Sequence, residues 1–377
     1  MGDCARPRAG PPQAPHARSG KRLFTILAPI LYAVHRLLYN GIRAPRRHGP
    51  RAPHRRPMST TVRPGIAVTA DGPFDPAAVR AADYCEIRAD LWPGGPAEAL
   101  ARIAASPRPV VFTCRTAAEG GRFRGSDAER APLFARARDL GAALVDIELR
   151  SALLRRGVAA GWPVLASLHD FAGPVEDIPD LLRTARDEGA AAAKIVSTAR
   201  SIADVVALRH ALDEPAPLPA AMFAMGPCGI PSRILALTWG SLLSYAAAET
   251  PAAPGQLTLS LYTELYGDAR TLPAHIALAG VERDLWPAAR AANRLCAQRR
   301  LGARAVPYPD AAPADFPAII DILGAQAVLD IRRIEGAGWR CAVHRAHMQP
   351  ATHSASTLDA ALDEALSALS ANREEGA

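Results

Sequence analysis

Short apolar runs alternate with longer segments of helical period between about residue 64 and residue 266. The runs have the length and composition of buried parallel strands, and the Ala-, Leu- and Arg-rich segments between them are long enough for helices. The predicted strands cover residues 65–70, 84–90, 109–115, 143–149, 163–171, 191–197, 220–226 and 241–246. This repetition predicts a (β/α)8 TIM barrel. An open doubly wound sheet is the alternative, but no Gly-x-Gly-x-x-Gly follows the first strand.

The pattern continues beyond the predicted barrel, so residues 271–377 are expected to form a smaller α/β domain. The predicted elements are strands at 273–281, 303–310 and 325–333 and helices at 286–302, 315–324 and 357–370. Gly302 and Gly324 are placed to end the first two of these helices. The fold class predicted for the chain is therefore a (β/α)8 barrel followed by a smaller α/β domain.

The start of the chain has a different composition. Residues 1–57 hold a dozen basic residues and one acid, Asp3, so about +11 of charge lies there and the rest of the chain is near −4. The apolar run at 23–39 is short for a membrane span. We predict a disordered basic extension over 1–57 and the barrel domain over 58–270, with Met58 as a conventional start.

These charges and the cysteine spacing exclude some classes of function. Because the folded part is mildly acidic, no nucleic-acid partner is expected, and no membrane partner is expected for the mature domain. The six cysteines form no Cys-x-x-Cys pair, which argues against a disulfide framework or a zinc site and favours a cytoplasmic protein. The Arg-rich, acid-poor start also resembles a transit peptide, so a plastid is the alternative location.

Lys194 is an unusual residue in this chain, because only two of the 44 basic residues are lysines, Lys21 and Lys194. It lies in the apolar stretch 189–197, GAAAAKIVS. An arginine cannot replace a lysine that forms a Schiff base, since the guanidinium stays protonated. A desolvated lysine loses its proton more easily and attacks carbonyl groups. The simpler alternative is a strand-end lysine with its amine in solvent.

Ionisable side chains recur near the ends of the predicted strands. Because alternate strand residues share a face, Glu86, Arg88 and Asp90 point one way. The others are Arg115, Glu119, Glu148, His169 and Lys194. Taken alone, His169 would be a hydrogen-bonded core histidine and Arg88 an ion pair with Glu86 or Asp90. Taken together, they indicate an active site, since chemistry lies at the carboxyl ends of barrel strands.

Six segments carry a family resemblance. EIRAD, TCRTAAEGGRF, SLHDF, AAKIV, MGPCGIPSR and APGQ occur in the order and spacing of type I 3-dehydroquinate dehydratases, over about residues 63–266. The resemblance implies a lyase of the shikimate pathway, which leads to chorismate and the aromatic amino acids. Such an enzyme converts 3-dehydroquinate to 3-dehydroshikimate through a lysine Schiff base, without a metal or an organic cofactor.

The resemblance also implies roles for individual residues. Lys194 would form the imine, His169 would be the general acid–base, and Glu86 would orient His169. The implied substrate contacts are Arg88, Arg115, Glu119, the carboxylate-binding Arg233, and Gln256 of the closing loop. We expect Arg88 and Arg115 to favour the neutral form of Lys194 by repulsion between like charges.

One position departs from the family pattern. Ala252 precedes the segment Ala253–Gln256, where the family often has a serine or threonine. The missing hydrogen bond is expected to weaken substrate binding by about 1 kcal/mol.

Two other functions are alternatives: another Schiff-base lyase or aldolase that acts on a keto acid, or a barrel that binds a metabolite without turnover. Arg233 and Gln256 favour a cyclic carboxylate substrate. The tail resembles a degenerate substrate domain of shikimate dehydrogenase, without activity because no lysine follows Lys194. An unrelated α/β appendage is the alternative. A homodimer is among the expected assemblies, and His344, His347 and His353 do not complete a metal-ligand set.

Overall fold

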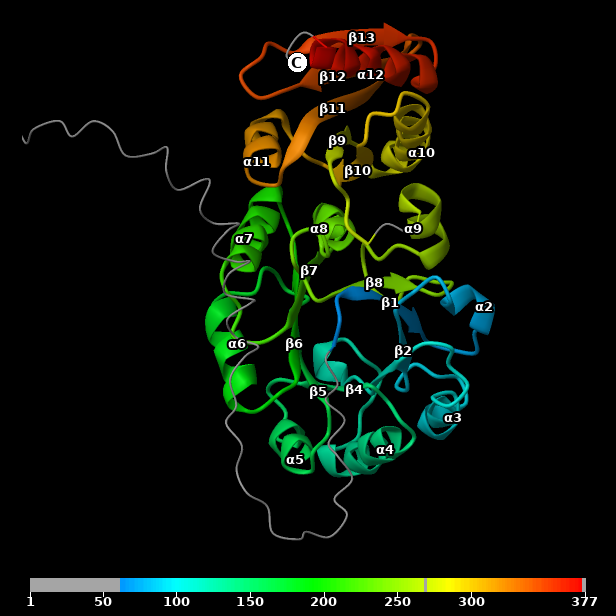
Figure 1. Cartoon of the computed structure of the whole chain (residues 1–377), viewed down its shortest axis with the longest axis vertical. Helices are drawn as coiled ribbons and strands as arrows, with labels where there is room; N and C mark the ends of the chain where they lie inside the picture. The colour runs from blue at the N-terminus through cyan, green and yellow to red at the C-terminus, as the bar shows by residue number, and fades with distance from the viewer. Residues whose placement is uncertain (1–61, 268–269, 375–377) are drawn as a thin grey trace, which may run out of the picture. The chain divides into compact units, whose positions relative to one another are not determined.

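The first part of the chain forms a parallel barrel. The computed structural model describes residues 62–267 and 270–374, so the predictions for residues 1–57 lie outside the described residues. Its first sheet has eight parallel strands in the order β7-β6-β5-β4-β3-β2-β1-β8 (Figure 1). The strands are β1 (Gly65–Ala70), β2 (Tyr84–Arg88), β3 (Val110–Thr113), β4 (Leu144–Glu148), β5 (Val164–His169), β6 (Ala192–Thr198), β7 (Ala220–Met225) and β8 (Leu243–Ala247).

The sheet curves round until its two edges meet. The backbone N–H of Leu242, just before β8, donates to the carbonyl of Ala220 in β7 at 2.8 Å. This bond bridges the seam between the last two strands. The predicted TIM barrel is therefore confirmed, and the open sheet is wrong.

Helices connect the strands and cover the outside of the barrel (Figure 1). They are α2 (Pro76–Val79), α3 (Gly95–Ala101), α4 (Asp127–Asp139), α5 (Leu153–Ala159), α6 (Ile178–Asp187), α7 (Ile202–Asp213), α8 (Ile230–Leu235) and α9 (Leu259–Tyr266). Helix α4 begins after Ser126, which forms a capping box with Glu129. Such local signals set where the helices start, while burial of their apolar faces holds them on the barrel.

The interior of the barrel is layered from apolar to polar along the strands. Leu144 of β4 and Leu165 of β5 belong to one apolar cluster. Two residues further along the same strands, Asp146 and Ser167 are polar, and both are buried. Because the strands are parallel, the polar level lies toward the carboxyl ends of all of them.

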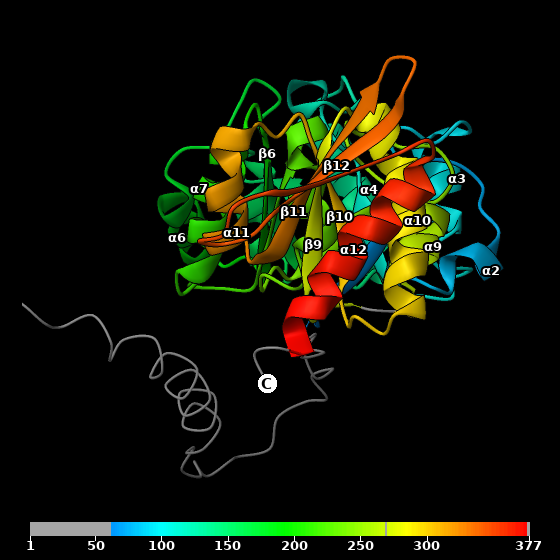
Figure 2. The same ribbon diagram turned by 90° about the horizontal axis from the view of Figure 1, so that it is seen from above.

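The second sheet is mixed, in the order β10-β9-β11-β12-β13. Its strands are β9 (His275–Gly280), β10 (Arg304–Pro309), β11 (Ala325–Ile334), β12 (Gly338–His344) and β13 (Ala351–Ala355). Its helices are α10 (Glu282–Gln298), α11 (Phe316–Asp321) and α12 (Leu358–Glu374). Helices α10 and α12 lie side by side (Figure 2), and Arg299 pairs with Asp363 between them at 2.6 Å. The predicted smaller α/β domain is confirmed.

The sequence analysis missed β12 and β13, an antiparallel pair. The pattern of β13 is polar and mostly exposed, so it has no apolar periodicity to detect. Among the described residues, no helix has the length and apolar character needed to cross a lipid bilayer.

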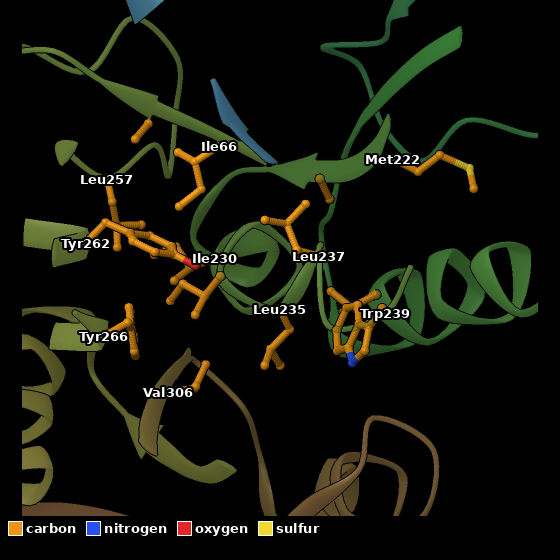
Figure 3. Packing of buried hydrophobic residues seen from close by; sticks show 14 of the residues in the cluster. Ile66, Met222, Ile230, Leu235, Leu237, Trp239, Leu257, Tyr262, Tyr266 and Val306 are labelled. Atoms are coloured by element: carbon orange, nitrogen blue, oxygen red, sulfur yellow. The ribbon is translucent and has the colours of Figure 1, made fainter. Parts of the chain in front are cut away.

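The apolar core is continuous from the barrel into the second sheet. Ile230 and Leu235 of α8, Tyr266 of α9 and Val306 of β10 belong to one buried cluster (Figure 3). The Tyr266 hydroxyl donates to the carbonyl of Ala305 at 3.3 Å. The second sheet therefore completes the burial of α8 and α9.

We expect the variant Tyr266→Ala to lower the free energy of unfolding by about 3–5 kcal/mol, because it opens a cavity in this shared core. The matched variant Tyr266→Phe keeps the ring and should cost about 1 kcal/mol, the value of one hydrogen bond. Urea unfolding of both variants measures this. A loss below about 1 kcal/mol for the alanine variant would contradict the shared core.

Candidate active site

The eight side chains to which the family resemblance gives a role in catalysis or substrate binding line one cavity. They are Glu86, Arg88, Arg115, Glu119, His169, Lys194, Arg233 and Gln256. The cavity lies where the carboxyl ends of the barrel strands converge, because each of these residues is on a strand or in the connection that follows one, except for Arg233 on α8. The structure therefore brings together residues that are up to 170 positions apart in the sequence, from Glu86 to Gln256.

Lys194 lies on β6 with its side chain only 5% exposed, so it does not reach solvent. Its Nζ is 3.2 Å from Glu86 Oε1 and 3.3 Å from Asp146 Oδ2. The same atom lies 3.9 Å from the centre of the Tyr245 ring. The groups in contact with the amine are therefore two carboxylates and an aromatic face, and the expected effect of Arg88 and Arg115 on it stays a prediction.

His169 ends β5 and pairs with Glu119. Its Nδ1 lies 3.2 Å from Glu119 Oε2, and its backbone N–H donates to the same oxygen at 3.0 Å. The prediction that Glu86 orients His169 is wrong. Glu86 lies on β2 at the level of Lys194, whereas Glu119 lies in the loop after β3, where it reaches the end of β5.

Burial shifts the acid–base behaviour of this pair. It lowers the pKa of His169 well below its usual value, and the nearby Arg115 adds to the effect. Burial also raises the pKa of Glu119 to about 7, against the opposing effect of Arg115. At neutral pH His169 is therefore a neutral base, and Glu119 is near its midpoint.

Glu86 is buried and accepts three hydrogen bonds from side chains. The Thr69 hydroxyl donates to Oε2 at 2.8 Å, and the Thr113 hydroxyl donates to Oε1 at 3.1 Å. The Lys194 amine donates to Oε1 as well. These bonds fix the orientation of the carboxylate that touches the amine.

Two of the predicted substrate-binding arginines are held by acids. Arg115 donates to Asp146 Oδ1 at 2.7 Å and to Ser167 Oγ at 2.6 Å. Arg88 donates two hydrogen bonds to Asp90, of 3.1 and 2.9 Å. The ion pair between Arg88 and Asp90, one of the alternatives from the sequence, is therefore confirmed. Both guanidinium groups line the cavity from fixed positions.

Arg233 differs from the other buried cations. Its side chain is buried, and within residues 62–267 and 270–374 it has no carboxylate partner. Its Nη2 donates to the carbonyl of Pro254 at 3.3 Å, and its guanidinium lies 4.8 Å from the centre of the Phe223 ring. Its Nε has no hydrogen-bond partner among the described residues. Burial lowers its pKa to about 9. Such a group is costly unless an anion joins it.

The loop of residues 252–256 forms one wall of the cavity. Ala252 and Ala253 line the cavity with methyl groups. The weaker substrate binding that is expected from Ala252 stays a prediction. Gln256 donates from Nε2 to Thr69 Oγ1 at 3.2 Å and accepts from the backbone N–H of Ala252 at 2.9 Å. Gly255 has φ +72°, and a Cβ there would lie 2.6 Å from the carbonyl oxygen of Gly226, which explains the glycine.

The sequence analysis missed Asp146 and Tyr245. Asp146 shares a strand face with Glu148, so the alternation that identified Glu86 and Arg88 could have found it. Tyr245 follows an apolar run and gave no such signal. Among the described residues, no three His, Cys, Asp or Glu side chains are arranged to hold a metal ion.

Comparison with known proteins points to the same family as the sequence motifs. The family model of type I 3-dehydroquinase matches residues 74–272. The chain is 33% identical over 213 residues to the 3-dehydroquinate dehydratase of Desulfotalea psychrophila, which covers 52% of this chain and 93% of that protein.

A longer plant protein and a crystal structure also match. The chain is 35% identical over 203 residues to the chloroplastic bifunctional 3-dehydroquinate dehydratase/shikimate dehydrogenase of Arabidopsis thaliana, which covers 51% of this chain and only 34% of that protein. The crystal structure of 3-dehydroquinate dehydratase from Geobacillus kaustophilus matches with a TM-score of 0.48 and 26% identity, over 53% of this chain and 88% of that one. On the family model and the Desulfotalea relative, this chain belongs to the type I 3-dehydroquinase family.

Proposed function

We propose that this chain removes water from 3-dehydroquinate to give 3-dehydroshikimate in the shikimate pathway, through an imine at Lys194. The observation that carries the proposal is one cavity that holds both a buried amine and Arg233, a buried cation that has no anionic partner in the part of the chain that the structure describes. An amine suits a ketone, and a guanidinium suits a carboxylate. 3-Dehydroquinate carries both groups.

The chemistry starts with attack of the Lys194 amine on the C3 ketone. Loss of water from this adduct leaves a protonated imine, which withdraws electrons and makes the C2 proton removable. The enamine that forms then expels the C1 hydroxyl as water, and hydrolysis of the imine releases the product. Glu86 and Asp146, both in contact with Nζ, are the groups that we propose to take up the proton of the amine.

His169 is the proposed general acid–base. Its Nδ1 lies against Glu119, which leaves Nε2 to take the C2 proton and to return a proton to the departing hydroxyl. The lowered pKa of His169 supports this role, because the ring is neutral at pH 7. Glu119, rather than Glu86, is then the residue that orients the imidazole.

Arg233 is the proposed carboxylate contact, with Gln256 nearby in the 252–256 loop. Arg88 and Arg115 are proposed to contact the hydroxyl groups of the substrate from their fixed positions. The absence of a cofactor, the homodimer and the cytoplasmic or plastid location stay predictions. So does the proposal that the tail is a remnant of a shikimate dehydrogenase substrate domain.

We expect borohydride to trap the imine on Lys194 when 3-dehydroquinate is present. Lys21 is the other lysine in the sequence, so mass spectrometry assigns the adduct without ambiguity. The variant Lys194→Arg keeps the charge and should give neither adduct nor turnover. Absence of an adduct on the peptide that contains Lys194 would contradict the proposal.

We expect Arg233→Met to raise KM by about 100-fold, because a charge-assisted bidentate contact is worth about 3 kcal/mol. The same variant should be at least as stable as the parent, since it removes an unpaired buried charge. Arg155→Met is a matched control, because Arg155 is 79% exposed and pairs with Glu188 outside the cavity. Unchanged KM in Arg233→Met would exclude it as the carboxylate contact.

We expect kcat/KM to fall as the pH falls through about 7. The raised pKa of Glu119 means that this carboxylate takes up a proton there and no longer accepts from His169 as an anion. His169 itself, with a lowered pKa, takes up its proton at a lower pH. In Glu119→Gln the limb near pH 7 should disappear along with much of the activity. A profile that Glu119→Gln leaves unchanged would contradict this role.

A further inference from the structure

We propose that Thr69 is a positioning residue that couples the 252–256 loop to the amine of Lys194. Thr69 lies on β1, and its hydroxyl touches both the loop and the carboxylate that contacts the amine. This inference rests on the proposed function for its kinetic effect. It adds a residue that neither the motifs nor the charge pattern pointed to.

The hydroxyl of Thr69 is used in both directions. It donates its one hydrogen to Glu86 Oε2 at 2.8 Å and accepts from Gln256 Nε2 at 3.2 Å. Glu86 in turn accepts from Lys194 Nζ through its other oxygen. A continuous path of side-chain hydrogen bonds therefore runs from Gln256 through Thr69 and Glu86 to Lys194.

The path is protected from solvent. Thr69 is 4% exposed and Gln256 is 8% exposed. In a buried chain of hydrogen bonds, each bond strengthens the next one. The loss of one member leaves the remaining polar groups poorly satisfied. Removing the hydroxyl would therefore change how Glu86 holds the amine.

The same loop also contacts Arg233. The carbonyl of Pro254 accepts from Arg233 Nη2 and from the backbone N–H of Gly226, both at 3.3 Å. The loop thus touches Arg233 directly and is linked to Lys194 through Thr69 and Glu86, so it connects the two groups that are proposed to receive the two ends of the substrate. A carboxylate bound at Arg233 affects where the loop lies. Through the hydrogen bonds of Thr69, the position of the loop then affects the orientation of Glu86 and of the Lys194 amine.

This coupling gives the imine step a dependence on the loop. The hydroxyl stays aligned on Glu86 while Gln256 fixes it from the other side. Without Gln256, the hydroxyl is able to rotate away, because a threonine hydroxyl turns to suit its partners. The amine would then be fixed for attack only while the loop is in place over the substrate.

A double-mutant cycle on kcat tests the coupling, using Thr69→Val, Gln256→Met and the double variant. Thr69→Val keeps the shape of the side chain and should lower kcat by about tenfold, with KM changed less than about threefold. Gln256→Met should lower kcat in the parent but not further in the Thr69→Val background. Thr69→Ser, which restores the hydroxyl, should recover most of kcat, and Thr69→Ala serves in the cycle should Thr69→Val fail to fold.

Losses in kcat that multiply in the double variant would overturn the coupling. An effect of Thr69→Val on KM alone, or a failure of Thr69→Ser to recover kcat, would do the same. A merely structural role would not move kcat and KM apart in this way.

A second measurement does not depend on turnover. Reductive methylation with formaldehyde labels amines, and Lys21 is the other lysine that mass spectrometry must follow. The rate at Lys194 should change at least threefold, and equally, in Thr69→Val, Gln256→Met and the double variant, while the rate at Lys21 is unchanged.

The two measurements separate the two proposals. Should the parent protein fail to dehydrate 3-dehydroquinate while the labelling cycle shows the coupling, the proposed function falls and the role of Thr69 stands. Should the parent turn over the substrate while labelling rates change independently in the two single variants, the coupling falls and the function stands.

Discussion

The contact of the Lys194 amine with Glu86 and Asp146 is the constraint on which the rest of the site depends. A buried amine between two buried carboxylates is costly unless every member of the set is hydrogen-bonded. Asp146 is therefore held by Arg115 and Ser167, and Glu86 by Thr69 and Thr113. The buried polar side chains inside the barrel therefore depend on one another, because each charged group needs a neighbouring polar group as its hydrogen-bond partner.

The barrel geometry explains why these residues meet. Glu86, Asp146, Lys194 and Tyr245 come from β2, β4, β6 and β8, and a barrel layer takes its side chains from alternate strands. A shift of one residue in the register of any of these strands would turn its side chain to the outside. The register that builds the core therefore also builds the site, and the two cannot vary independently.

Arg233 shows the opposite arrangement within the same cavity. Arg115 is surrounded by acids, whereas Arg233 faces an aromatic ring and a backbone carbonyl. Within the described residues Arg233 thus lacks an anion, at a cost in stability, and a bound anion would offset that cost. The second sheet contributes to this part of the site from behind, because its core packs on α8, the helix that carries Arg233.

The sequence by itself determined the barrel, because period and strand length are local properties, and the predicted strand at 65–70 agrees with β1 to the residue. It also determined that Lys194 lies within a strand and His169 at the end of one, and the motifs identified the family. It did not determine that Glu119 rather than Glu86 reaches His169, nor that Asp146 and Thr69 join the network, because those contacts depend on distances between strands. Strand β13 was decided only by tertiary structure as well, since pairing with β12 stabilises a strand whose own sequence lacks apolar alternation.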